Sequence, residues 1–211
     1  GNSRVALVDS DGGILGLRTY TNVYHRDSAY EDGQYFLPED WAALLLRGCR
    51  ELCREHPDIQ VNAVSAAGAR QSFVLLDGNG RAFLGLPNID NRGRAYMAQV
   101  PEHDEIYRLS GKWATEDFGA AKLLGLRMQH PEQYEAVESV LSLSEWIAWI
   151  FTGRKVMEYT QACESQLYDI GQRSWSQTLC SFYGLRPEFL PPLQAAGTAV
   201  GPILDTYRRE L

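Results

Sequence analysis

Two tight-turn signals, each set between two apolar runs, constrain the fold of this 211-residue chain more than any other feature. The turns are Asp-Ser-Asp-Gly-Gly at residues 9–13 and Asp-Gly-Asn-Gly at residues 77–80. The flanking apolar runs are residues 5–8, 14–17, 73–76 and 82–86. Asp, Asn and Gly favour hairpin turns because they tolerate left-handed backbone conformations. The sequence therefore predicts two β-hairpins in the first half of the chain.

The segments around these hairpins predict a helix between them and mostly helices after them. Pro38 and the two acidic residues that follow it indicate a helix start, with Trp41 and Leu45 on one face. Apolar spacing predicts further helices over residues 91–100, 104–109, 118–127, 131–136, 144–151 and 175–183. Apolar runs predict other strands over residues 60–66, 137–141 and 200–203, and residues 19–36 are interpreted as a strand followed by a loop. This order indicates a layered α/β domain.

The composition excludes disorder and disfavours two classes of partner. Hydrophobic residues make up 45% of the chain, which is enough to bury a core. The 20 basic and 27 acidic residues give a net charge of −7, and such a surface repels nucleic acid and anionic lipid. No apolar run approaches the roughly 20 residues of a membrane span, and no secretory signal opens the chain. We therefore expect a cytoplasmic protein with neither a nucleic-acid nor a membrane partner.

Common catalytic and metal motifs are absent. Cys49 and Cys53 are four residues apart, but no second pair of ligands completes a metal site, and Cys163, Cys180 and the four histidines are scattered. The sequence also lacks the GxxxxGK[ST] and GxGxxG phosphate-binding motifs, a GxSxG elbow and an HExxH helix. The pattern alone therefore predicts an α/β domain with a polar site whose chemistry and metal are unknown.

A series of weak motifs in a fixed order gives a more specific prediction. Pro-Asn-Ile-Asp-Asn-Arg at residues 87–92 resembles a W-x-D-x-R element, with Asn88 where Trp is usual. Tyr-Arg-Leu-Ser-Gly at residues 107–111 resembles Y-x-x-T-G, and residues 143–153 resemble a D-Y-L…L-T-G helix. Matching segments also occur at residues 1–13, 64–80, 167–175 and 190–201. Together they resemble the N-terminal domain of the FGGY carbohydrate kinases.

The resemblance implies a fold and an activity. The fold is the actin-like, ribonuclease H-like ATPase domain, with a mixed central sheet flanked by helices over residues 1–211. The activity is ATP-dependent phosphorylation of a sugar or polyol hydroxyl, with ATP and Mg²⁺, a pentulose such as xylulose being the favoured substrate. The alternatives are a quorum-signal (autoinducer) or glycerol-type kinase, and a sugar-binding kinase fragment without turnover. A cytoskeletal actin-fold ATPase is disfavoured, and a homodimer is one expected assembly.

The resemblance also implies that parts of the family's catalytic equipment lie outside this chain. The first strand, with the Asp and Gly-Thr of the phosphate loop, is expected before Gly1. The general-base Asp and the nucleotide-binding domain are expected after Leu211. We therefore expect no catalytic residue within this segment, and a segment that is catalytically incomplete by itself.

The family's phosphate and substrate sites map onto two short segments. Ser3 and Arg4 are what remains of the phosphate loop and are expected to face ATP, because a hydroxyl and a guanidinium can bind phosphate oxygens. Arg70 and Gln71 take the two middle positions of the substrate loop. Arg donates from a fixed fork, while Gln both donates and accepts, which suits the paired hydroxyls of a sugar.

Three further residues are expected to bind substrate. Asp90 and Arg92 belong to the element at residues 87–92, and either orient substrate or form a structural ion pair. Asp117 occupies a position that, by the resemblance, contacts substrate in polyol and ketose kinases.

Overall fold

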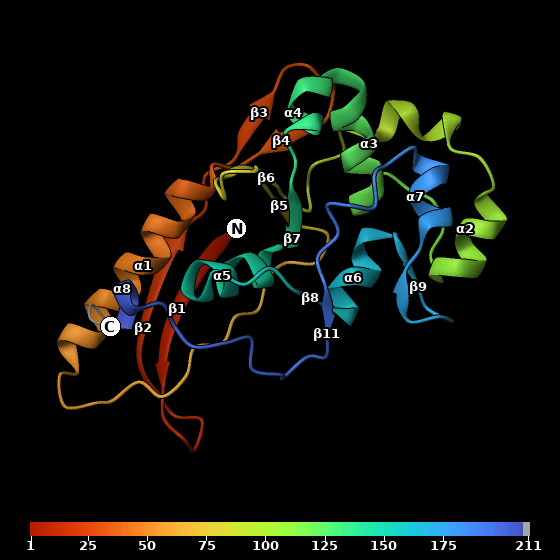
Figure 1. The fold of residues 1–211 in the computed structure, drawn as a ribbon. Coiled ribbons are helices and arrows are strands. Elements are labelled where there is room, and N and C mark those ends of the chain that lie inside the picture. The colour runs from red at the N-terminus through yellow and green to blue at the C-terminus, as the bar shows by residue number, and fades with distance from the viewer. Residues whose placement is uncertain (209–211) are drawn as a thin grey trace.

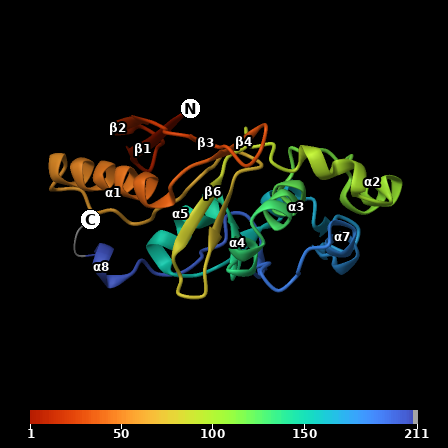
Figure 2. The same cartoon turned by 90° about the horizontal axis from the view of Figure 1, so that it is seen from above.

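The computed structural model describes residues 1–208 and begins with two antiparallel hairpins. Strands β1 (Asn2–Val8) and β2 (Ile14–Thr21) form the first, and the short strands β3 (His25–Asp27) and β4 (Gly33–Tyr35) form the second. Helix α1 (Pro38–Glu55) packs against one face of β1 and β2 (Figures 1 and 2). Since side chains alternate across a strand, that face takes every second residue of β1, and the others stay exposed.

A three-stranded antiparallel sheet forms the centre of the molecule. Its order is β6 (Ala82–Leu86), β5 (Phe73–Leu76) and β7 (Ser139–Ser142). Every residue of β5 is buried, and its side chains alternate between two cores. Val74 and Leu76 face a cluster built with α1 and α5, whereas Phe73 and Leu75 face the larger cluster under the remaining helices. The domain is therefore a layered α/β structure with helices on both faces of the sheet.

The second half of the chain is mainly helical and covers the larger core (Figure 1). Its helices are η1 (Arg94–Gln99), α2 (His103–Ser110), α3 (Gly119–Gln129), α4 (Pro131–Glu135), α5 (Leu143–Thr152), α6 (Tyr159–Ser165), α7 (Gln177–Tyr183) and α8 (Asp205–Arg208). Its remaining strands are β8 (Met157–Glu158), β9 (Tyr168–Asp169), β10 (Ser174–Trp175) and β11 (Leu193–Gln194). No helix within residues 1–208 is both long enough and apolar enough to cross a bilayer.

Most predicted elements are confirmed, but two predicted strands are wrong. Residues 60–66 form no strand, and their backbone pairs with no strand of the described chain. Residues 200–203 also form none; Pro202 lacks the N–H that a strand ladder needs. The helix predicted over residues 91–100 is the shorter 3₁₀ helix η1, and the β3–β4 hairpin was not predicted.

Candidate functional site

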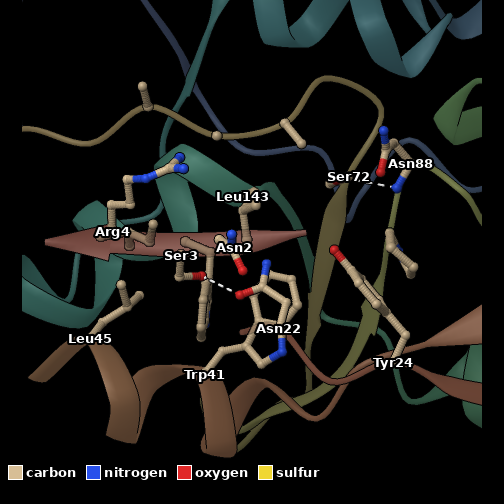
Figure 3. A pocket seen from close by; sticks show the side chains of 16 residues that line it. Asn2, Ser3, Arg4, Asn22, Tyr24, Trp41, Leu45, Ser72, Asn88 and Leu143 are labelled. Atoms are coloured by element: carbon tan, nitrogen blue, oxygen red, sulfur yellow. Dashed lines mark hydrogen bonds between the residues drawn. The ribbon is translucent and has the colours of Figure 1, made fainter. Parts of the chain in front are cut away.

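A polar pocket of about 260 Å³ lies where six segments meet. One wall is the start of β1, and another is the irregular stretch at residues 67–69, with Ser72 after it. The segment after β2, helix α1, the loop after β6 and the beginning of α5 complete it. The lining residues that the sequence analysis did not single out for the site include Asn2, Asn22, Tyr24, Ser72 and Asn88 (Figure 3).

Hydrogen bonds fix the polar groups on two sides of this pocket. The Ser3 hydroxyl donates to Asn22 Oδ1 at 2.7 Å, and the Asn88 backbone N–H donates to Ser72 Oγ at 3.0 Å. Figure 3 shows both pairs, with the Tyr24 hydroxyl directed into the space between them. The pocket therefore presents hydroxyl and carboxamide groups, which are suited to a ligand that both donates and accepts hydrogen bonds.

The remaining side chains of the lining are mainly apolar. Trp41, Leu45, Leu143 and Trp146 contribute to it. The Trp41 Nε1–H donates to Val23 O at 3.3 Å. Trp146 is only 1% exposed, and within residues 1–208 its Nε1–H has no hydrogen-bond partner.

The predicted phosphate-side residues and the predicted substrate loop meet at this pocket. Ser3 and Arg4 line it, and Arg70 and Gln71 lie between two lining residues, Ala69 and Ser72. The Arg70 side chain is exposed, and among residues 1–208 neither its guanidinium nor that of Arg4 forms an ion pair. Both cations are therefore available to an anionic or hydroxyl-bearing ligand.

The substrate loop is held in an unusual backbone conformation. Gln71 has φ 59°, in the left-handed region that only a minority of non-glycine residues adopt. Directly after it, the buried Ser72 carbonyl accepts the Leu143 N–H at 3.0 Å. The start of β5 therefore fixes one end of the loop to the start of α5.

Asp90 and Arg92 lie behind the pocket and do not line it. Both side chains are fully buried, and Arg92 Nε donates to Asp90 Oδ2 at 2.8 Å. Asp90 Oδ1 also accepts the Gln34 N–H at 2.8 Å, and the Arg92 guanidinium lies 3.6 Å from Asp27 Oδ2. Burial raises the pKa of Asp90, against the opposing effect of Arg92. These contacts connect residues 90–92 to the β3–β4 hairpin, as a structural ion pair does.

Asp117 is exposed and also stays outside the pocket lining. Its Oδ2 accepts the Thr115 hydroxyl at 3.1 Å, and it lies just before the start of α3. Of the seven predicted residues, Ser3 and Arg4 line the pocket, whereas Arg70 and Gln71 lie between lining residues without belonging to the lining themselves. Asp90, Arg92 and Asp117 also lie outside the lining.

Sequence reasoning missed the side chains that come from unremarkable positions. Asn22 and Tyr24 follow β2 in a segment without a motif, so nothing in the sequence marked them. Asn88 carried a signal, because it stands where the W-x-D-x-R element has Trp.

The described residues do not offer a cluster of metal ligands. Among residues 1–208, no group of three or more His, Cys, Asp or Glu side chains is arranged to hold a metal ion. The described residues therefore do not form a metal centre built from protein ligands alone.

The fold and the pocket define a layered α/β domain with a polar site, and comparisons with known proteins show its family. A profile described as the FGGY family of carbohydrate kinases, N-terminal domain, matches residues 1–210. The chain therefore belongs to this family.

Individual relatives and solved structures agree with the family. YoaC of Bacillus subtilis, provisionally designated a sugar kinase, is 40% identical over the whole chain, which covers 43% of YoaC. An autoinducer-2 kinase of Salmonella choleraesuis is 31% identical over 70% of the chain and 29% of its own length. The chain thus spans less than half of these relatives.

Solved structures show the same fold at low identity. A ligand-bound xylulose kinase from Lactobacillus acidophilus superposes with a TM-score of 0.89 at 17% identity, over 99% of this chain and 43% of that one. A glycerol kinase from Plasmodium falciparum, solved with ADP, gives a TM-score of 0.87 at 14% identity, over 99% and 44%. The predicted actin-like fold is confirmed.

Proposed function

We propose that this chain is the substrate-binding part of a kinase that transfers a phosphoryl group from ATP to a hydroxyl of a sugar or polyol. One observation carries the proposal: the predicted phosphate-side residues, Ser3 and Arg4, and the predicted substrate loop lie at one polar pocket in a chain of the FGGY family. Phosphoryl transfer depends mainly on positioning and charge stabilisation, and the pocket offers fixed hydrogen-bonding groups for the first of these.

We assign the sugar hydroxyls to the loop side of the pocket. The Arg70 guanidinium and the Gln71 carboxamide would bind paired hydroxyls, and the Asn88 carboxamide would add a third polar contact. Arg4, on β1, would face the phosphates of ATP, whose charge its guanidinium complements. Asp117 could contact substrate only from outside the pocket lining, and Asp90 and Arg92 would act through the loop that they hold.

We consider three candidate substrates, in order of preference. A pentulose of the xylulose type is our first, by the resemblance of the motif series. An autoinducer-type substrate is the second, and the identity of 31% to an autoinducer-2 kinase favours it, whereas the xylulose kinase structures share only the fold. A glycerol-type polyol is the third.

ATP and Mg²⁺ enter this proposal on different grounds. Arg4 is exposed and forms no ion pair within residues 1–208, so its guanidinium fits a polyphosphate, which supports ATP as the phosphoryl donor. For the metal, residues 1–208 offer no cluster of three or more ligands, so Mg²⁺ would be held in part by the phosphates of ATP. When bound, Mg²⁺ would neutralise phosphate charge.

We also propose that the domain is completed by chain that lies outside this sequence. Among the described residues β1 pairs with β2 alone, so its other edge is unpaired, and residues 60–69 lie in no strand. A further strand along that edge of β1 would give its unpaired N–H and C=O groups hydrogen-bond partners. The general-base Asp and a nucleotide-binding domain would follow Leu211.

The test is a kinase assay of the complete gene product against xylulose, other pentuloses, glycerol and autoinducer-2. We expect ATP-dependent phosphorylation of at least one of them. Binding of a sugar without any turnover would instead support the binding-only fragment. Neither binding nor turnover with any member of the panel would contradict the proposal.

Replacing Arg70 with Met is expected to raise the KM for the sugar by about 10- to 100-fold, because a charged hydrogen bond contributes about 1.5–3 kcal/mol. The measurement is steady-state kinetics with sugar and ATP varied in turn, and the KM for ATP should change little. Arg81→Met is the matched control, since Arg81 is an exposed arginine at the turn end of the same hairpin. Equal effects of the two variants would contradict a role for Arg70 in sugar binding.

A further inference from the structure

A fully buried lysine lies directly behind the pocket and belongs to no predicted site. Lys122, on α3, is 0% exposed. Its ammonium donates to three backbone carbonyls: Pro87 O at 2.8 Å, Asn88 O at 3.3 Å and Asp90 O at 2.5 Å. One side chain thus holds almost the whole loop that follows β6.

This loop is part of the pocket wall. Pro87 and Asn88 both line the pocket, and the Asn88 N–H is in turn bound by Ser72. Lys122 holds the loop from behind, and Ser72 holds it from the substrate-loop side. Within residues 1–208 the Asn88 carboxamide itself has no hydrogen-bond partner, so it is free to bind a ligand.

The carbonyls around Lys122 explain a lysine at this position. Its neighbours along α3, Ala121 and Leu123, are buried apolar residues, and a buried ammonium is costly unless it is fully satisfied. An ammonium offers three donors that can point to three different carbonyls. An apolar side chain of similar volume would leave these three carbonyls without that donor, and the loop without that anchor.

We infer that Lys122 is a positioning residue for the sugar site: its ammonium fixes the loop at residues 87–90 and thereby sets the place of the Asn88 carboxamide in the pocket. This inference rests on the proposed function. We therefore expect Lys122 to affect the binding of the sugar and not the binding of ATP.

The charges around Lys122 allow its protonation to be used as a readout. Asp90 and Arg92 face it from the loop, and Asp117 faces it from the segment before α3. Burial lowers the pKa of Lys122 to about 8, and the Asp90 carboxylate partly opposes that effect. Below this pH the ammonium donates to all three carbonyls. Above this pH the neutral amine keeps only two N–H donors, so the loop loses one of its hydrogen bonds to Lys122.

The first experiment uses the complete enzyme and the sugar that it phosphorylates best. Lys122→Met is expected to raise the KM for the sugar by about tenfold or more, because a small displacement of a positioning loop weakens binding strongly. The KM for ATP and kcat should change by less than about threefold. Lys155→Met, at a half-buried lysine after α5, is the matched control and should leave all three unchanged.

Coupling between residues separates positioning from a general loss of stability. If Lys122 acts through Asn88, Asn88→Ala should raise the KM for the sugar, and adding Lys122→Met should raise it little further. Additive effects of the two substitutions would show that Lys122 does not work through Asn88, and would overturn the inference.

The pH profile of the unmodified enzyme remains decisive even if Lys122→Met fails to fold. Since sugar binding needs the protonated state, the KM for the sugar should rise about tenfold between about pH 7 and pH 9, following the fraction of competent enzyme. The rise should be absent in Asn88→Ala. A KM that stays flat, or rises equally in both enzymes, overturns the inference while leaving the kinase activity standing. An enzyme that phosphorylates no sugar overturns this inference together with the proposed function.

Discussion

Replacing Asp90 with Ala is expected to lower the free energy of unfolding by about 3–5 kcal/mol, because removing one partner of a buried ion pair leaves the other charge unpaired. Asp90 is fully buried, and its two oxygens accept from Arg92 Nε and from the Gln34 N–H, each at 2.8 Å. The alanine variant would leave both donors without that acceptor. Urea denaturation of the purified protein measures the change.

Two companion variants distinguish the charge from the hydrogen bonds. Asp90→Asn keeps an acceptor for the Gln34 N–H but loses the negative charge beside Arg92, so its loss should be smaller than that of Asp90→Ala. Replacing both partners, as Asp90→Leu with Arg92→Met, should cost less than Asp90→Ala alone, since neither charge of the pair is then left without its partner. A double variant less stable than the single one would contradict this account of the pair.

Local signals in the sequence were sufficient for much of the fold. Each predicted hairpin turn carries Asp and Gly at the positions where the structure bends, and Asp9 and Asp77 accept backbone N–H groups inside their own turns. Pro38 with its acidic neighbours does begin α1. These features are decided within a few residues, so no knowledge of distant contacts was needed.

Features that depend on distant neighbours were less predictable. The run at residues 60–66 has strand composition, yet whether it becomes a strand depends on a partner elsewhere. Likewise, an acidic residue and an arginine two positions apart read equally well as substrate ligands or as a structural pair. Only the packing of β4 against them, through the Gln34 backbone, shows that Asp90 and Arg92 are held inside the domain.

The pocket illustrates the same division between local and distant information. Motif order singled out Ser3, Arg4, Arg70 and Gln71, because the family's loops are marked by short sequence patterns. Ser3 and Arg4 line the pocket, and the binding roles of all four stay predictions. Lys122 escaped notice because a single lysine within an apolar helix has no distinguishing pattern. Its role emerges only when the three carbonyls at residues 87, 88 and 90 are seen around its ammonium.

Replacing Gly93 with Ala is expected to destabilise the domain by about 3 kcal/mol or more, near the upper end of overpacking effects. A Cβ at Gly93 would lie 2.1 Å from the carbonyl oxygen of Ala121 and 2.5 Å from its carbonyl carbon. Both atoms belong to the backbone of α3, so no side-chain rotation can relieve the clash. Gly125, on α3, makes the matching close approach to the loop: a Cβ at Gly125 would lie 2.6 Å from the carbonyl oxygen of Arg92.

The consequence reaches beyond stability, because α3 also carries Lys122. Pushing α3 away from residues 92–93 would move the ammonium relative to the loop that it holds, so any folded Gly93→Ala protein should also bind sugar more weakly. Gly78→Ala is the matched control: a Cβ there meets nothing within 4 Å, and the turn does not need a positive φ at that residue. Urea denaturation should therefore separate the two variants by about 3 kcal/mol. If the two variants were equally stable, α3 would be able to shift without a loss of stability. The close packing of α3 on this loop would then not fix the position of Lys122.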